Sequence, residues 1–279
     1  MVIRLTYRMR NAAGVCLAIF LFTTGFGYVP VQARDTVVEQ ADALQVSGSA
    51  LGRKLPDYSF RDTGQRLVRL SDFRGKPLVI SLVYTSCQSS CPVTTQTLAQ
   101  AVDVARDALG RESFAVVTVG FDARADTPQR MRAFAHGQGI DLNNWRFLST
   151  DSETRDRLVA DLGFTFFPSP QGFDHIAQTS IIDAEGIVYR QVYGADFTSP
   201  HLVEPLKNLV FGRNGNLTSI DGLINRIRLF CTLYDPASER YMFDYSVVIG
   251  GSIGFTILSI LAVFLLRAWL RQSAQYRAP

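Results

Sequence analysis

Two uninterrupted apolar runs dominate the middle of the chain. Leu78–Val83 and Phe114–Val119 contain no charged residue, and such runs are typical of parallel strands buried on both faces. Apolar positions at helical spacing follow the first run from Val93 to Leu109. After the second run, Thr127-Pro128 supplies a cap and a first helical residue, so a helix is expected to about His136.

Shorter segments complete the predicted domain. Their composition and turn residues predict further helices at 152–162 and 199–211, and further strands at 58–60, 66–70, 145–148, 176–182 and 187–193. The stretch 163–173 is rich in aromatic residues and proline and is expected to be a loop. Strands that alternate with helices and end in a hairpin predict an α/β domain over residues 51–213, with a mixed central sheet flanked by helices.

The N-terminus has the pattern of a secretory signal. Three arginines among the first ten residues precede an apolar stretch, and small residues around Ala33 offer a cleavage point. Residues 1–33 are therefore predicted to be a signal peptide, with an uncleaved membrane anchor as the alternative. The mixed, polar segment 34–50 is expected to be a flexible leader.

The segment 246–266 predicts a C-terminal transmembrane helix. It has no charged residue, and its length suits a bilayer core, which needs about 20 apolar residues. Three arginines follow it and acidic residues precede it. The positive-inside rule then places the tail 267–279 in the cytoplasm and the domain in the periplasm or another extracytoplasmic space. Residues 214–245 are predicted to be an amphipathic linker, with a helix at 219–230.

Charge and cysteine content narrow the classes of function. The net charge is +3 over 279 residues, and basic residues do not cluster with aromatic ones, which gives nucleic-acid binding little support. Removal of the signal, with its Cys16, leaves Cys87, Cys91 and Cys231. An odd number of cysteines in an oxidising compartment means that at least one is free, bound to metal or shared between chains.

The first candidate for a redox or metal-binding site is the stretch Cys87-Gln88-Ser89-Ser90-Cys91. It lies between the first apolar run and the helix that follows, and Pro92 suits the first turn of that helix. The amide dipoles of a helix N-terminus favour thiolate over thiol. Two thiols at this turn can form a disulfide, bind a soft metal or exchange between these states.

His175 is the third candidate, since it stands just before the strand at 176–182. In a thioredoxin-like arrangement the loop before that strand packs beside the two cysteines, so two sulfurs and one imidazole would converge. Thiolates select Cu(I), zinc or iron–sulfur. A structural zinc site normally has four protein ligands, which makes copper the better match. His136 is expected at the end of a helix, and His201 is expected on the surface.

At these positions the sequence resembles the Sco/SenC family. The matching residues span about 51 to 212 and are Gly52-Arg53, Leu55-Pro56-Asp57, Leu70–Pro77, Tyr84–Cys87, Cys91-Pro92, Phe121-Asp122, Asp126–Pro128 and Asp174-His175. The resemblance implies a thioredoxin fold, copper, as Cu(I) or Cu(II), bound by Cys87, Cys91 and His175, and a role in assembling the dinuclear copper centre of cytochrome c oxidase. The chain departs from the family pattern in three respects: no proline follows Asp122, Ala125 replaces an arginine, and the anchor follows the domain.

Two functions are consistent with these residues. The first is a membrane-tethered copper chaperone that delivers copper to an acceptor subunit of a respiratory oxidase or a similar copper enzyme. The alternative is a thiol–disulfide oxidoreductase in which Cys87 and Cys91 form the redox pair, a thiol reductant protein being its partner. The CxxxC spacing and the lack of a proline in Ile176–Thr179 favour the chaperone.

Three further features each keep more than one interpretation. Asp122 and Asp126 suit an acidic pair beside the site as well as they suit loop capping. Asp174 can orient His175 or cap the loop. Cys231 can be a buried free thiol, an interchain bridge or an additional thiol for the site.

Overall fold

The computed structural model describes residues 33–141, 145–170, 172–212, 232–235, 240–243 and 245–275. The chain divides into two compact units, Met1–Ala41 and Asp42–Pro279. Three predicted features lie outside the described residues: the signal segment up to residue 32, the helix at 219–230, and Cys231.

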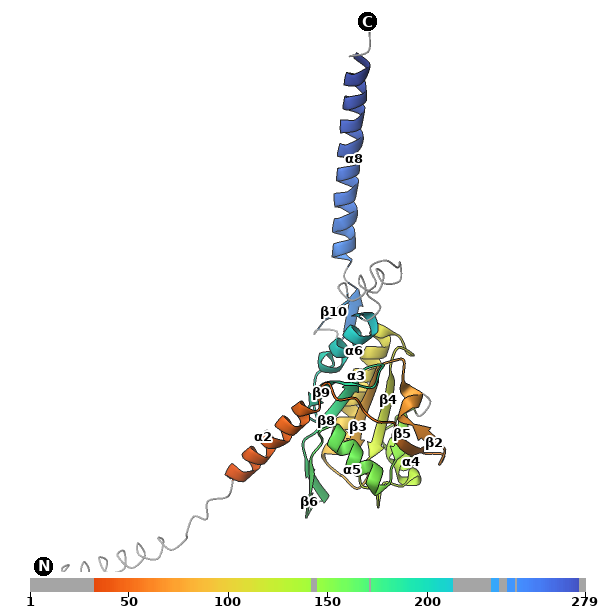
Figure 1. Cartoon of the computed structure of the whole chain (residues 1–279), viewed down its shortest axis with the longest axis vertical. Helices are drawn as coiled ribbons and strands as arrows, with labels where there is room; N and C mark the ends of the chain where they lie inside the picture. Colours follow the sequence, from red (N-terminus) through yellow and green to blue (C-terminus); the bar gives the residue numbers. More distant parts are fainter. Residues whose placement is uncertain are drawn as a thin grey trace, which may run out of the picture. The chain divides into compact units, whose positions relative to one another are not determined.

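A seven-stranded mixed sheet forms the centre of the second unit (Figure 1). The strand order is β2-β1-β5-β4-β3-β8-β9, with β3, β4 and β5 parallel and the other pairs antiparallel. The strands are β1 Ser59–Asp62, β2 Leu67–Arg69, β3 Leu78–Val83, β4 Ala115–Gly120, β5 Arg146–Ser149, β8 Gln178–Ile182 and β9 Val188–Tyr193. The prediction of an α/β domain with a mixed sheet is confirmed.

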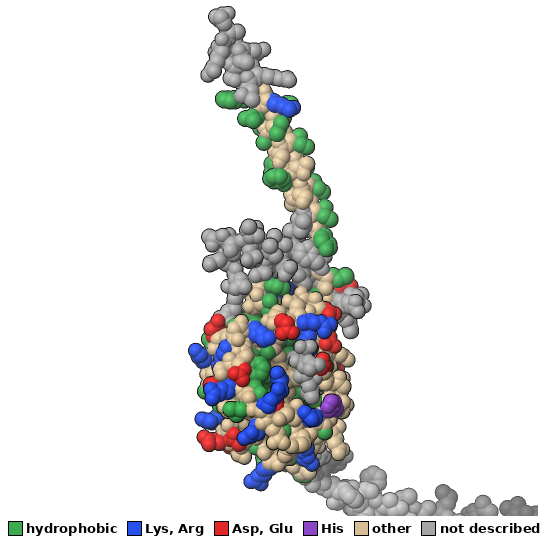
Figure 2. Space-filling view, turned by 90° about the vertical axis from the view of Figure 1, so that its right-hand side faces the viewer, with side chains coloured by type: hydrophobic (Ala, Val, Ile, Leu, Met, Phe, Trp, Pro, Cys, Tyr) green, Lys and Arg blue, Asp and Glu red, His purple; other side chains and the backbone are tan. Residues whose placement is uncertain are grey.

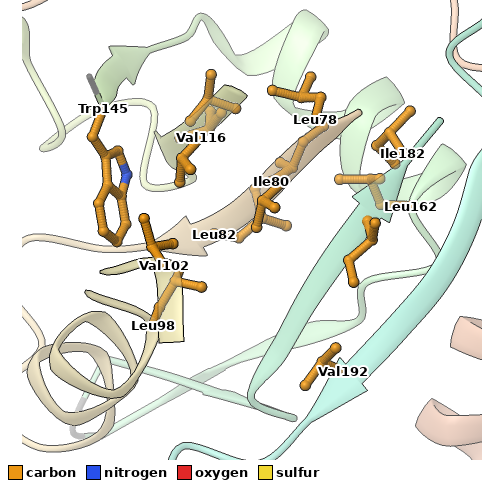
Figure 3. Packing of buried hydrophobic residues seen from close by; sticks show 14 of the residues in the cluster. Leu78, Ile80, Leu82, Leu98, Val102, Val116, Trp145, Leu162, Ile182 and Val192 are labelled. Atoms are coloured by element: carbon orange, nitrogen blue, oxygen red, sulfur yellow. The ribbon is translucent and has the colours of Figure 1, made fainter. Parts of the chain in front are cut away.

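The two apolar runs form the central strands. Every residue of β3 is buried, as are all residues of β4 except Ala115, because both faces of a central strand are covered by other elements. Figure 3 shows Leu98 and Val102 of the helix after β3 beside Leu82. The core is therefore built on the strand that leads directly to the cysteines.

Four helices accompany the sheet: α3 Ser90–Leu109, α4 Pro128–Gly137, α5 Ser152–Asp161 and α6 Pro200–Gly212. The Thr127 side chain caps α4 by accepting from the Arg130 N–H, as predicted, and Asp151 caps α5 by accepting from the Thr154 N–H. A short 3-10 helix, η1 Leu70–Phe73, leads towards β3. Helices α3 and α6 pack against each other (Figure 1). Helix α3 begins three residues earlier than the expected Val93, which brings Cys91 into its first turn.

The segment expected to be a flexible leader forms a helix, α2 Ala33–Ser49. In the part that belongs to the second unit, Ala43 and Ser47 are buried, as is Ala50 just beyond the helix. The Ser47 hydroxyl lies 2.9 Å from the hydroxyl of Tyr193 on β9. These buried side chains are small and lie four and three residues apart, so they carry little hydrophobic signal in the sequence.

The expected loop at 163–173 contains strands instead. β6 Phe166–Ser169 and β7 Gly172–His175 pair antiparallel as a separate two-stranded sheet (Figure 1). Phe166 and Phe173 hold this hairpin to the domain, with ring centroids 5.1 and 5.4 Å from the ring of Phe121. Pro168 fits because an edge strand tolerates a missing N–H.

A second hairpin precedes the C-terminal helix. It comprises β10 Thr232–Asp235 and β11 Arg240–Phe243, and Tyr241 packs against the core, its ring centroid 5.7 Å from Lys207 Nζ. The helix α8 Ser246–Gln275 follows. Within the described part of the chain, α8 alone is long and apolar enough to cross a membrane, over Ile249–Arg267. Figure 2 shows hydrophobic side chains along α8, whereas charges of both signs intermingle on the domain.

Candidate metal-binding and redox site

The two cysteines lie in the connection between β3 and α3. The Cys87 N–H donates to the carbonyl of Tyr84 at 3.1 Å, which closes a tight turn directly after the strand. Cys91 belongs to the first turn of α3. Both thiols are free, and the residues are only 6% and 2% exposed. A buried strand and a long helix therefore fix the backbone on both sides of the pair.

Hydrogen-bond donors surround the sulfur of Cys87. The Cys91 N–H lies 3.3 Å from it, the Ser90 hydroxyl 3.5 Å and the Ser89 hydroxyl 3.9 Å. The side chain of Tyr84 also lowers the pKa of this thiol. Burial alone would raise the pKa of Cys87, but the donors stabilise the thiolate more strongly and lower this pKa to about 6. Cys87 is thus a thiolate at neutral pH.

Cys91 has the opposite electrostatic environment. Its burial is nearly complete and raises the pKa of its thiol, and the charge of Cys87 raises it further. The pair therefore consists of one thiolate and one thiol at neutral pH.

We expect an alkylating agent to modify Cys87 and to spare Cys91. In the reduced protein the rate of modification by iodoacetamide should rise with pH through a midpoint near 6, because the thiolate is the nucleophile. Peptide mass spectrometry over a pH series measures both sites. A Cys91→Ser variant should keep the modification of Cys87, and preferential labelling of Cys91 would contradict the assignment.

His175 ends β7 and is surrounded by aromatic rings. Its ring centroid lies 5.3 Å from that of Phe164, 5.6 Å from Phe121 and 6.0 Å from Tyr84. Nδ1 is 3.0 Å from the carbonyl oxygen of Ile176. A carbonyl only accepts, so Nδ1 is assigned the proton and Nε2 keeps its lone pair.

The environment of His175 keeps its imidazole neutral. Burial lowers the pKa of His175, and the Ile176 carbonyl and the charge of Asp174 oppose this only in part. Neutral imidazole is the form that binds metal ions. The residue therefore has the protonation state of a ligand.

One pocket separates the cysteine loop from the β6–β7 hairpin. Its volume is about 500 Å³, and it is lined by Tyr84, Ser86, Gln88, Ser89 and Ser90 on one side and by Ser169, Phe173, Asp174 and His175 on the other. Among the residues that the structure describes, no three His, Cys, Asp or Glu side chains are grouped closely enough to hold a metal ion. The fold thus brings His175 and the cysteine loop to the same pocket without assembling a three-ligand cluster.

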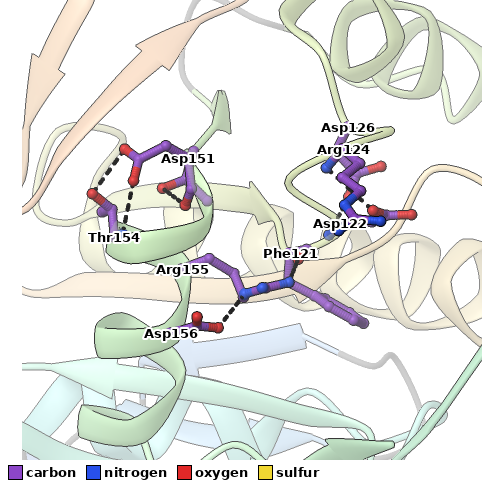
Figure 4. Close-up of polar contacts among 9 residues, drawn as sticks. Phe121, Asp122, Arg124, Asp126, Asp151, Thr154, Arg155 and Asp156 are labelled. Atoms are coloured by element: carbon purple, nitrogen blue, oxygen red, sulfur yellow. Dashed lines mark hydrogen bonds and ion pairs between the residues drawn. The ribbon is translucent and has the colours of Figure 1, made fainter. Parts of the chain in front are cut away.

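Asp126 supports the cysteine loop through hydrogen bonds to Thr85. From the sequence, this role could not be distinguished from loop capping. Its Oδ1 accepts from the N–H and hydroxyl of Thr85, at 2.8 and 2.7 Å, and its Oδ2 accepts from the Asp122 N–H at 2.9 Å. Burial raises the pKa of Asp126 although these donors oppose the shift. Asp122 is half-buried and caps its own loop through the N–H groups of Arg124 and Ala125 (Figure 4).

Gly120 makes this arrangement possible. A Cβ at Gly120 would lie 2.4 Å from the Cβ of Asp126 and 2.8 Å from the sulfur of Met131. The loop sequence does not separate Asp126 from Asp122, because the space that Asp126 fills depends on Gly120 in the neighbouring strand β4.

Four further residues were singled out in the sequence: His136, His201, Asp174 and Cys231. His136 is exposed near the end of α4. His201 is exposed, with Nδ1 2.9 Å from the Thr198 hydroxyl. Asp174 is exposed and lines the pocket, whereas Cys231 is outside the described residues.

Comparison with known proteins identifies similar sequences and folds. The sequence model of SCO1/SenC proteins matches residues 48–210. A SCO1 protein homolog of Bacillus subtilis is 23% identical over 154 residues, which are 53% of this chain and 78% of that protein. A SCO1/SenC family lipoprotein of Bacillus anthracis is 22% identical with a TM-score of 0.52, over 57% of this chain and 96% of its own. ScoI of Bradyrhizobium japonicum, solved with copper bound, is 19% identical with a TM-score of 0.47, over 57% and 99%.

Proposed function

Because the chain belongs to the SCO1/SenC family, whose sequence model matches residues 48–210 of its 279, we propose that it is a membrane-tethered copper chaperone. Cys87, Cys91 and His175 bind the copper. The acceptor is the dinuclear copper site of a respiratory terminal oxidase, which the protein supplies or prepares. The observation that carries this function is the pocket that a thiolate loop and a neutral imidazole share.

The donor set supports copper over other metals. Two sulfurs and one imidazole are soft to intermediate ligands, which suit Cu(I) and also hold Cu(II). A structural zinc site normally has four protein ligands, one more than this set provides. Cys87 is already a thiolate, so only Cys91 has to release a proton when the metal binds.

Bound copper passes to the acceptor by exchange of the ligands of this chain for those of the acceptor. The pocket opens beside Ser86 and Gln88, both exposed, so an incoming thiolate can approach the metal from the side of the cysteine loop. Each acceptor sulfur that binds copper replaces one ligand of this chain. The copper ion therefore needs no free state in solution between the two proteins.

A second function is favoured by the acidity of Cys87. The Cys87 thiolate attacks one sulfur of a disulfide in the acceptor and forms a mixed disulfide, and the other acceptor sulfur leaves as a thiolate. Cys91 then attacks Cys87, its proton passes to the departing acceptor sulfur, and a Cys87–Cys91 disulfide remains. A dithiol reductant protein must reduce that disulfide before the next cycle.

Membrane tethering is proposed from α8. Its large apolar side chains are exposed, among them Phe255 at 75% and Phe264 at 68%, and exposure of so many apolar groups to water is unfavourable. We place the signal at 1–33, the domain at 51–213 outside the cytoplasm, the linker at 214–245, the span at 246–266, and the tail 267–279 in the cytoplasm.

Copper stoichiometry and reductase activity together test the proposal. The full chain in detergent, with Cys16 and Cys231 replaced by serine, should bind about one copper when reduced and none when Cys87 and Cys91 are oxidised to a disulfide. Metal analysis after gel filtration measures the copper stoichiometry, and turnover of a peptide disulfide measures the reductase activity. Copper retained by the oxidised protein would contradict the ligand set. Rapid turnover without copper retention would establish the reductase instead.

A further inference from the structure

The side chain of Arg155 extends from α5 to the aromatic residues around His175. Its Nη1 donates to the carbonyl of Phe121 at 3.2 Å, and its Nε donates to Oδ1 of Asp156 at 2.6 Å (Figure 4). The guanidinium carbon lies 5.4 Å from the ring centroid of Phe166. One side chain of α5 therefore contacts both the residue after β4 and the first strand of the β6–β7 hairpin.

Both contacts are adjacent to His175. Phe121 is fully buried, its N–H donates to the carbonyl of Val83 at 2.8 Å, and its ring centroid lies 5.6 Å from that of His175. Phe166 pairs with His175 across the hairpin, and its ring centroid lies 5.1 Å from that of Phe121. Phe121 is thus tied to the core strand β3, whereas Phe166 belongs to the hairpin. Arg155 joins the two.

A guanidinium suits this position better than an ammonium. The group is planar, so its face can pack on an aromatic ring while the N–H groups at its edge donate in the plane. Arg155 donates to a carbonyl and to a carboxylate, and its guanidinium is within cation–π range of Phe166. The side chain is only 19% exposed, so water has limited access to replace these contacts. A lysine would supply the charge but not all three contacts at once.

We propose that Arg155 is a positioning residue that holds the β6–β7 hairpin against Phe121 and thereby keeps His175 at the pocket. The consequence for copper rests on the proposed function, whereas the holding of the hairpin does not. Arg155 is not one of the residues that line the pocket, and it acts through Phe166. Removal of the guanidinium should let the hairpin open more often and leave the core strands unchanged.

Arg155→Met in the full chain in detergent tests this holding without metal. Methionine keeps an unbranched side chain but loses the hydrogen bond to Phe121 and the charge near Phe166. Hydrogen exchange of the amides in β6 and β7 should become about fivefold faster, the effect of one hydrogen bond, and exchange in β3 and β4 should not change. Arg155→Lys should recover part of the difference, because a cation remains near the ring. Unchanged exchange in the hairpin, or equal acceleration throughout the domain, would overturn the proposal.

Copper release tests whether the hairpin matters for the His175 ligand. Release of Cu(II) to a chelator should be about fivefold faster from Arg155→Met than from the wild-type protein, because the hairpin that carries the imidazole opens more often. In a His175→Ala background the same substitution should leave the release rate unchanged, since no ligand of that variant stands on the hairpin. An equal effect in both backgrounds, or unchanged release in the protein that keeps His175, would overturn the positioning role. A wild-type chain that binds no copper would refute the proposed function, and hydrogen exchange would still decide whether Arg155 holds the hairpin.

Arg157→Met is the matched control on the same helix. The guanidinium carbon of Arg157 lies 5.8 Å from the ring centroid of Tyr58, and Nη2 lies 3.9 Å from Oε1 of Glu153. This variant removes the same kind of group and the same charge from α5, but hairpin exchange and copper release should keep their wild-type values. If Arg157→Met accelerated both as Arg155→Met does, damage to α5 would explain both variants and the proposal would fail.

Discussion

Replacing His175 by alanine is expected to weaken Cu(II) binding by at least about 100-fold while the Cys87–Cys91 pair remains oxidisable. Substitution of groups that merely orient a ligand costs about 10- to 100-fold in metal affinity, so the loss of a ligand should exceed that range. The sulfur of Cys87 keeps its hydrogen bonds in the variant, because their donors come from the cysteine loop and the first turn of α3. A competitive titration followed by the charge-transfer absorption measures the affinity, and a thiol assay measures oxidation.

His136→Ala and His201→Ala provide controls within the same chain. Both histidines are exposed and neither lines the pocket, so both variants should bind Cu(II) with the wild-type spectrum and affinity. If His175→Ala also kept them, the imidazole would have to be removed from the proposed ligand set. A simultaneous loss in the controls would point to general damage in place of a lost ligand.

Asp126→Ala is expected to lower the free energy of unfolding by about 3 kcal/mol, since three half-buried donors would lose their acceptor at about 1 to 3 kcal/mol each and entering water would recover part of the loss. The donors are the N–H and hydroxyl of Thr85 and the N–H of Asp122. Thr85 stands two residues before Cys87, so the cysteine loop should also become more mobile. Urea unfolding of the full chain in detergent, followed by the fluorescence of the buried Trp145, measures the loss.

Asp151→Ala is the matched control for this prediction. Asp151 also accepts from the N–H and hydroxyl of one threonine, Thr154, at 2.9 Å each (Figure 4). It is exposed at the start of α5, where loss of an N-cap costs about 1 kcal/mol because water replaces the carboxylate. Equal destabilisation by the two substitutions would show that burial of Asp126 contributes nothing.

The sequence predicted the elements whose signals are local. Leu78–Val83 and Phe114–Val119 are apolar throughout because both faces of these strands are covered. The cap Thr127 acts on an N–H group only three residues away. The turn that carries Cys87 could be located because an apolar strand ends there and a helix begins soon after.

The features that were missed depend on partners distant in the chain. The helix α2 buries small residues such as Ser47, whose hydroxyl partner Tyr193 is 146 residues away. Asp126 reaches Thr85 across 41 residues, and no local pattern distinguishes it from Asp122. The β6–β7 strands were read as a loop because Pro168 and the aromatic residues suggest irregular structure. These contacts exist only once the sheet has assembled.

The proposed cysteine and histidine ligands are expected to stay bound to copper for different times, because only the histidine stands on the β6–β7 hairpin. Cys87 and Cys91 are joined to β3 and α3, whereas His175 stands at the end of a two-stranded sheet of four residues per strand. A hairpin of that size has little stability of its own and opens at a lower free energy than core strands. The imidazole can therefore detach while both sulfurs hold, which would make it the first ligand to leave when the ion changes hands.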